Sequence, residues 1–192
     1  MNILFVNACV HPESRTKRLA NYFLSKIDGD VKEVNLNEEK IPPLNMETLM
    51  YRTRLTEEMN FDEAIFKYAN DYANADMIVV AAPYWDLSFP SVLKIYIENI
   101  NVNGIVFKYD DKGDVIGLCN AKNLVYITTA GGEINHEYGF EYIKSIAQDF
   151  HGIKKVDYIK AEKLDIIGED VEEILQKAEE KIDKLVKKEF KE

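Results

Sequence analysis

Short apolar runs rich in β-branched residues alternate with longer amphipathic segments along the chain. Such alternation is typical of βαβ units, in which helices connect parallel strands and cover both faces of the sheet. The run at residues 77–82 is apolar throughout, as expected for a strand buried on both faces. We therefore expect an α/β fold around a five-stranded parallel sheet. The predicted strands are residues 3–7, 31–36, 77–82, 124–128 and 156–159.

The segments between these strands carry the spacing and the start signals of helices. One segment departs from the alternation: at residues 107–118, apolar positions flank a turn-rich centre, which predicts an inserted β-hairpin. No internal repeat or flexible linker divides the chain, so we expect one domain spanning residues 1–192. The predicted helices are residues 16–27, 56–72, 90–100, 138–150 and 169–190.

Acidic residues outnumber basic residues by 34 to 24, which gives a formal net charge of −10. A field of this sign repels nucleic-acid phosphates and anionic lipid headgroups, so we expect neither nucleic acid nor a membrane as a partner. Two cysteines, Cys9 and Cys119, are too few for a four-ligand metal site or a disulfide framework. No apolar run approaches the roughly 18 residues of a transmembrane helix, and the N-terminus lacks the features of a signal peptide. These features predict a cytoplasmic protein without a metal site.

The loop after the first strand has the composition of an anion site. Open α/β sheets bind ligands beyond the carboxyl ends of their strands, yet the chain has no G-x-G-x-x-G motif and no P-loop. Instead, Ser14 and Thr16 open a helix whose first turn contains Arg15, Lys17 and Arg18, although a helix N-terminus ordinarily favours acidic side chains. Backbone N–H groups, hydroxyls and cations together favour a phosphate. The alternative is that Ser14 or Thr16 is only a helix N-cap.

The same loop also satisfies C-x5-R-[ST], the signature of cysteine-dependent phosphatases. That interpretation makes Cys9 a thiolate nucleophile, with Arg15 and Thr16 completing the motif. Pro12 removes a backbone donor from such a loop, and Glu13 places a negative charge beside the phosphate. A buried, unreactive Cys9 is the structural alternative, and we favour it.

Two further loops carry residues suited to a flat ligand. The loop after the third strand contains Tyr84 and Trp85, which can stack on such a ligand, fill an interface or pack in the core. The loop after the fourth strand contains Gly131 and Gly132, which either form a simple turn or let backbone N–H groups approach a ligand closely.

Taken in order, these loops resemble those of the FMN-dependent NADH:azoreductases and the related NAD(P)H:quinone oxidoreductases. The shared features are the S-x-[ST] loop at residues 14–16, the proline-aromatic segment at 83–94, the hairpin with Phe107 and Tyr109, and the Gly-Gly turn at 131–132. The resemblance covers nearly the whole chain. It implies a flavodoxin-like three-layer sandwich with sheet order 2-1-3-4-5.

The resemblance also implies roles for individual residues. Ser14, Arg15 and Thr16 would hold the FMN phosphate, and His136 and Tyr138 would act as catalytic side chains that stabilise negative charge on the reduced flavin. Phe107 and Tyr109 would form a substrate pocket by capping the flavin of a partner chain. The residues assigned to the flavin ring are Pro83, Tyr84, Trp85, Asp86 and Leu87 on one side, and Thr129, Ala130, Gly131 and Gly132 on the other.

The activity implied by the resemblance is a ping-pong transfer from NADH or NADPH, through FMN, to a quinone, azo or nitro compound. The resemblance further implies a homodimer with two sites at its interface. Two positions depart from the azoreductase pattern, which commonly has Asn at Asp86 and Arg at Ala130. A carboxylate at 86 would disfavour anionic reduced flavin, and Ala130 removes a cation, so both changes count against azo compounds as the acceptor.

Three other classes of protein remain as alternatives. A flavodoxin-type electron carrier would bind FMN without turning over a nicotinamide, but its usual T-x-T-G-x-T phosphate loop is absent. A response-regulator receiver needs acidic residues where this chain has Asn7 and Ala8. An interaction module without a cofactor would leave the cations of the first loop unexplained.

Overall fold

Five parallel strands form the central sheet in the order β2-β1-β3-β6-β7, which confirms the predicted order of the sheet strands. A computed structural model describes residues 1–190. β1 pairs with β2 on one side and with β3 on the other, so that Val6 lies opposite both Val34 and Val80. The strands of the sheet are β1 (Asn2–Asn7), β2 (Asp30–Asn35), β3 (Met77–Ala81), β6 (Asn123–Thr129) and β7 (Lys155–Ala161).

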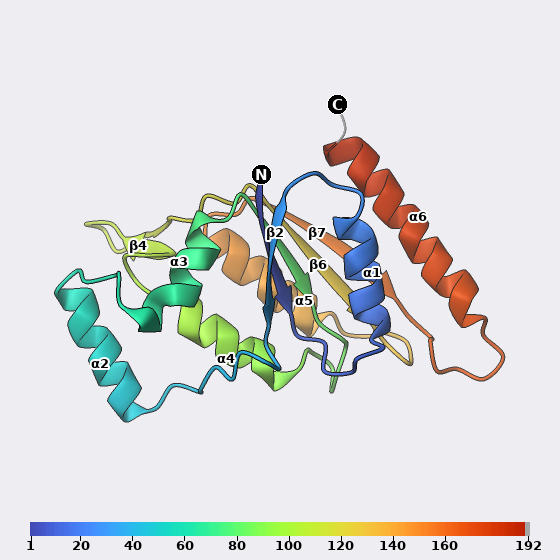
Figure 1. The fold of residues 1–192 in the computed structure, drawn as a ribbon, viewed down its shortest axis with the longest axis horizontal. Coiled ribbons are helices and arrows are strands. Elements are labelled where there is room, and N and C mark those ends of the chain that lie inside the picture. Colours follow the sequence, from blue (N-terminus) through green and yellow to red (C-terminus); the bar gives the residue numbers. More distant parts are fainter. Residues whose placement is uncertain (191–192) are drawn as a thin grey trace.

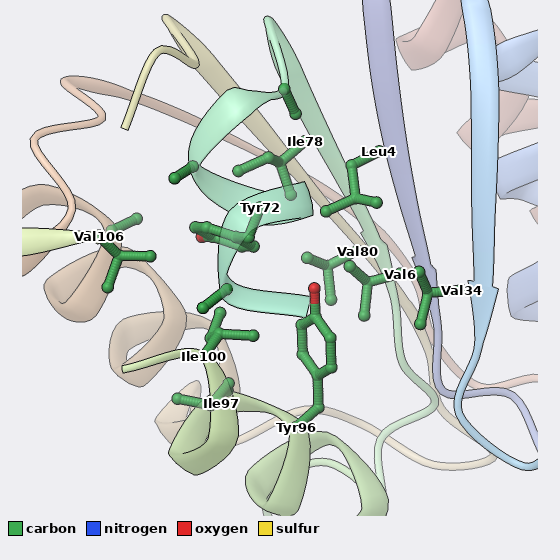
Figure 2. Close-up of a cluster of buried hydrophobic side chains, with 14 of the residues drawn as sticks. Leu4, Val6, Val34, Tyr72, Ile78, Val80, Tyr96, Ile97, Ile100 and Val106 are labelled. Atoms are coloured by element: carbon green, nitrogen blue, oxygen red, sulfur yellow. The ribbon is translucent and has the colours of Figure 1, made fainter. Parts of the chain in front are cut away.

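Helices cover both faces of the sheet, so the predicted three layers are present (Figure 1). Side chains alternate along β1: Leu4 and Val6 belong to one buried cluster, and Ile3 and Phe5 belong to the other. The first cluster joins the sheet to α3, α4 and α5, and Figure 2 shows Tyr96 of α4 pointing toward the sheet within it. The second cluster joins the sheet to α1 and α6. The helices are α1 (Arg15–Leu24), α2 (Met46–Glu57), α3 (Lys67–Asn74), α4 (Ser91–Ile100), α5 (Tyr138–Ser145) and α6 (Val171–Glu189).

Helix α6 shows how local signals define an element. The side chain of Asp170 accepts a hydrogen bond from the N–H of Glu173 at 3.1 Å and so caps the N-terminus. Acidic side chains occupy the first turn, and Lys187 and Lys188 occupy the last, as the helix dipole favours. Within residues 1–190, no helix combines the length and the apolar character needed to cross a bilayer.

The prediction of one helix over residues 56–72 is wrong, because the segment before β3 contains two helices and a 3-10 turn. Asn45 begins α2 instead: its side chain accepts from the N–H of Thr48 at 2.9 Å, and Thr48 Oγ1 accepts from the N–H of Asn45 at 3.0 Å. Just after α2, Met59 takes a left-handed conformation with a φ of 52°. A 3-10 turn (Ala64–Phe66) then leads into α3. The prediction missed α2 because its capping pair is not the usual Ser or Thr with Glu or Gln.

The helix predicted over residues 138–150 is present in two parts. α5 ends at Ser145, and a single π-helical turn (Ile146–Phe150) continues it. His151 follows this turn and is fully buried.

The predicted hairpin is also present, with β4 (Phe107–Tyr109) antiparallel to β5 (Val115–Gly117). After β5, the N–H of Asn120 donates to the carbonyl of Ala73 at 2.8 Å, close to the end of α3 and the start of β3. The hairpin therefore lies at the amino ends of the sheet strands (Figure 1).

Candidate active site

The loops that follow β1, β3, β6 and β7 lie at the carboxyl ends of the strands (Figure 1). Residues of these four loops line one cleft. Its volume of about 600 Å³ is within the range of cofactor sites. Most residues predicted to bind a cofactor line this cleft. Asp86, Leu87 and Gly132 do not line it, although each lies within two residues of one that does. The lining residues are His11, Glu13, Ser14, Arg15, Thr16, Pro83, Tyr84, Trp85, Thr129, Ala130, Gly131, Leu164 and Asp165.

Ser14 and Thr16 have different environments. Ser14 is the N-cap of α1, and its Oγ accepts from the N–H of Lys17 at 3.2 Å. The N–H groups of Arg15 and Thr16 come first in the helix and have no acceptor within it, which leaves them for an outside acceptor. The Thr16 side chain is buried, and its Oγ1 lies 2.6 Å from that of Thr129. This hydrogen bond connects the loop after β1 to the end of β6.

The three cations of the first turn of α1 all have carboxylate partners. Arg15 pairs with Asp165 at 2.7 Å, Lys17 with Glu33 at 3.1 Å, and Arg18 with Glu172 at 2.8 Å. The sequence argument that these cations require a bound anion is therefore not sufficient. Their partners lie far away in the sequence, so no local pattern could have shown them.

The loop after β3 contains a tight two-residue turn. The N–H of Trp85 donates to the carbonyl of Ser88 at 3.1 Å, and the N–H of Ser88 donates to the carbonyl of Trp85 at 2.8 Å. Between them, Asp86 and Leu87 have φ angles of 50° and 68°. Such turns favour Gly, Asn or Asp, and a Leu in this region costs about 1–2 kcal/mol. Trp85 and Leu87 are about half exposed, so neither is a core residue.

The two glycines in the loop after β6, Gly131 and Gly132, differ in the space around their Cα atoms. A Cβ on Gly132 would meet nothing, whereas a Cβ on Gly131 would lie 2.3 Å from the Oδ2 atom of Asp165. Gly131 thus makes room for a carboxylate of the protein itself. The prediction missed Asp165 and Leu164 because it considered only the loops after the first, third and fourth sheet strands. The loop after β7 lies at the same edge of the sheet, and this position could have identified Leu164 and Asp165 as candidates.

His136 and Tyr138 stack on each other, with ring centroids 5.0 Å apart and an angle of 4° between the rings. Both are exposed, and neither lines the cleft. The hydroxyl of Tyr84 donates to the carbonyl of His136 at 3.1 Å, which attaches the segment carrying this pair to a residue that lines the cleft.

Cys9 has the environment of a structural cysteine. It is 5% exposed, and its Sγ lies 3.7 Å from the carbonyl oxygen of Ala81. Burial raises the pKa of the Cys9 thiol, although a hydrogen bond with Ser14 opposes the shift. Because a nucleophilic cysteine must be a thiolate, this environment argues against the phosphatase alternative.

Phe107 and Tyr109 do not line the cleft of their own chain. Phe107 is buried and packs edge-on against Tyr109 and Phe150, with centroids 5.5 and 5.4 Å away. Of the two, only Tyr109, which is about half exposed, is open to contact by another molecule.

A doubly wound parallel sheet with its ligand cleft beyond the carboxyl ends of β1, β3 and β6 defines a flavodoxin-like α/β protein. The Flavodoxin_2 family model, described as a flavodoxin-like fold, matches residues 1–186. The chain belongs to this family.

Similar proteins cover almost the whole chain. The FMN-dependent NADH:quinone oxidoreductase 2 of Clostridium acetobutylicum is 38% identical in an alignment of 192 positions, which covers 93% of this chain and 94% of that protein. The FMN-dependent NADH:quinone oxidoreductase of Clostridium perfringens is 35% identical over 97% of this chain and 98% of that protein.

Among solved structures, an azoreductase from Bacillus anthracis has a TM-score of 0.80 at 24% identity, covering 98% of this chain and 99% of that one. An FMN-dependent NADH-azoreductase from the same species, in complex with FMN, has a TM-score of 0.81 at 21% identity, with the same coverage. These structures share the fold of the present protein.

Proposed function

We propose that this protein is an FMN-dependent oxidoreductase that takes electrons from NADH or NADPH and passes them to a quinone, azo or nitro compound by a ping-pong mechanism. The observation that carries the proposal is the near-full-length similarity to FMN-dependent NADH:quinone oxidoreductases at 35–38% identity. NADH appears in the names of these relatives, and NADPH is our extension. The two unpaired cysteines, Cys9 and Cys119, support a reducing, cytoplasmic location.

The residues of the cleft fit an FMN molecule. Ser14, with the first N–H groups of α1, offers hydrogen-bond donors and a positive helix end to a phosphate. Trp85 offers an exposed aromatic face at the cleft. Next to the cleft, the open space beside Gly132 leaves the backbone after β6 accessible. Bound FMN supplies the hydride chemistry, and the protein orients it and shields it from water.

His136 and Tyr138 are the residues we propose for stabilising negative charge on the cofactor. An imidazole and a phenol can each donate a hydrogen bond to an anionic edge of a ring. Their parallel stacking and the anchor from Tyr84 support this role, because both limit the directions in which the donors can point.

An absorption experiment tests the proposed function. We expect the purified protein to bind FMN and to lose the visible absorption of the oxidised flavin on anaerobic addition of NADH. Addition of a quinone should restore the absorption. FMN that binds but is not reduced would favour the electron carrier, and the absence of FMN binding would contradict the proposal.

We also propose a homodimer, with the second copy covering an apolar face of α2. Met46, Leu49 and Met50 are exposed on this helix and Met59 just after it, and Leu55 is the only α2 residue buried in the chain. Clustered exposed apolar side chains mark interaction surfaces.

Arg52 holds the α2 face in place. Its guanidinium donates to the carbonyls of Glu98 and Asn101 at 2.9 and 3.0 Å, at the C-terminal end of α4. A face that is exposed but rigidly held favours a partner that docks on it. Exposed Trp85, Leu87 and Tyr138 support the further proposal that the two sites lie at the dimer interface.

Replacing Met50 with Glu should convert the dimer to a monomer, because a charge would be buried at the proposed interface. Light scattering should show the mass fall from twice 22.1 kDa to that of one chain. The control is Val31→Glu on the exposed edge strand β2, which should remain dimeric. A monomeric wild-type protein, or a Met50→Glu variant that stays dimeric, would refute the proposed interface.

A further inference from the structure

The loop between β7 and α6 is attached to the loop after β6 by successive backbone hydrogen bonds. The N–H of Lys163 donates to the carbonyl of Gly132 at 2.9 Å, and the N–H of Asp165 donates to the carbonyl of Gly131 at 3.0 Å. A third bond, from Leu164 to Ala130, lies between them at 3.2 Å. The backbone of Asp165 is therefore held in place beside the cleft.

The Asp165 carboxylate lies between two of the loops that form the cleft. Its Oδ1 accepts a hydrogen bond from Nη1 of Arg15 at 2.7 Å. Its Oδ2 lies over Gly131, in the space that a Cβ would fill. Nη1 of Arg15 also donates to the carbonyl of Leu164 at 3.2 Å, so the guanidinium is directed at the β7–α6 loop.

Arg15 is the only Lys or Arg among the described residues that line the cleft. Its charge is balanced by Asp165, and Glu13 adds a second carboxylate to the lining. An incoming phosphate and the Asp165 carboxylate are both anions that a guanidinium binds well, and both would use the same donor groups.

We propose that Asp165 is a tethered competitor that the FMN phosphate must displace from Arg15. This inference rests on the proposed FMN-dependent function and assigns Asp165 a role in cofactor selection. Asp165 weakens the binding of flavin that carries a phosphate, and it leaves flavin without a phosphate unaffected. It therefore sets how strongly the cleft distinguishes FMN from riboflavin.

Fluorescence titrations of the flavin-free protein with FMN and with riboflavin test this proposal. Asp165→Asn should bind FMN about fivefold more tightly than wild type, since an exposed ion pair is worth up to about that factor. Riboflavin affinity should not change. The gain should shrink at high salt, because salt screens exposed charges.

Two further variants separate the ion pair from a general effect of charge. Glu172→Gln is the matched control: it removes the same charge from a partner of another α1 cation, Arg18, but Glu172 does not line the cleft. We expect it to leave both affinities unchanged. In an Arg15→Gln background, Asp165→Asn should give a clearly smaller gain in FMN affinity, because no guanidinium remains to be released and only the repulsion between the carboxylate and the phosphate is removed.

The opposite results would overturn the inference. Weaker or unchanged FMN binding by Asp165→Asn would show that Asp165 does not compete. An equal gain for riboflavin would show that the phosphate is not involved, and a gain that is just as large without Arg15 would show that the guanidinium is not involved. These outcomes leave the proposed function intact if wild type binds FMN, whereas a wild type that binds neither flavin would refute both.

Discussion

Lowering the pH from 7 to 4 should reduce the free energy of unfolding by about 3 kcal/mol through His151 alone. This side chain is 1% exposed, with Nδ1 3.1 Å from the hydroxyl of Tyr72 and Nε2 2.7 Å from Oδ1 of Asn101. Because Asn101 Oδ1 can only accept, Nε2 is the protonated nitrogen and Nδ1 accepts from Tyr72, so the neutral ring is fully satisfied. Burial lowers the pKa of His151 from 6.5 to about 4.

The direction of this pH effect on the free energy of unfolding follows from the state of the chain that binds the proton. Between pH 6.5 and about 4, the unfolded chain binds a proton at His151 and the folded chain does not, so folding becomes less favourable as the pH falls. The contribution is fully present above about pH 6.5 and is lost as the pH approaches 4. Each unit of pKa difference corresponds to about 1.4 kcal/mol, which gives the figure of about 3 kcal/mol.

Urea unfolding of wild type and His151→Gln at several pH values between 7 and 4 measures this effect. Gln keeps a donor and an acceptor but does not titrate in this range. Carboxylates contribute to the pH dependence of both proteins, so the difference between them isolates His151. We expect the variant to be less stable at pH 7 and the two stabilities to converge at low pH. A difference that stays constant from pH 7 to 4 would contradict the prediction.

Replacing Ser14 with Asp should weaken FMN binding about a hundredfold or more and leave the fold stable. Asp caps a helix as well as Ser does, and its charge suits a helix N-terminus. A carboxylate about 4 Å from a phosphate dianion, however, costs about 2 kcal/mol in water and more in a partly buried site. Riboflavin, which lacks the phosphate, should bind the variant as it binds wild type.

The matched control is Asn45→Asp, which adds the same charge at the N-cap of α2 and does not line the cleft. It should leave the affinity for FMN unchanged. Titration of both variants and a thermal melt of each provide the test. If Ser14→Asp lost FMN and riboflavin equally, its effect would lie in the shape of the cleft, and the α1 N-terminus would not be the phosphate site.

The fold was largely predictable because its signals are local. The buried strand β3 is apolar throughout, and α6 carries both its cap and its dipole charges within its own segment. Helix α2 lacked such signals, since Asn45 and Thr48 form an unusual capping pair and all of its apolar residues except Leu55 face outward. A helix whose apolar face is exposed in the chain does not follow the pattern of a helix packed on the core.

The site was predictable only where it depends on position along the sheet. Loops after parallel strands meet at one edge, so Ser14, Tyr84 and Thr129 were expected to lie together, and all three line the cleft. Pairings across the fold could not be inferred in this way. Arg15 and Asp165 are separated by 150 residues, and only the three-dimensional structure shows that the space at Gly131 is occupied by a carboxylate.

The turn at Asp86 and Leu87 has a consequence for the speed of binding. Two backbone hydrogen bonds close this turn, so its residues already have a defined conformation before a ligand arrives. Ordering a flexible residue costs about 1–2 kcal/mol of conformational entropy, and a preformed segment avoids most of that cost at each encounter. In the ping-pong cycle that we propose, donor and acceptor would enter and leave the same cleft in every turnover. A rigid rim allows this exchange without a loop having to fold and unfold each time.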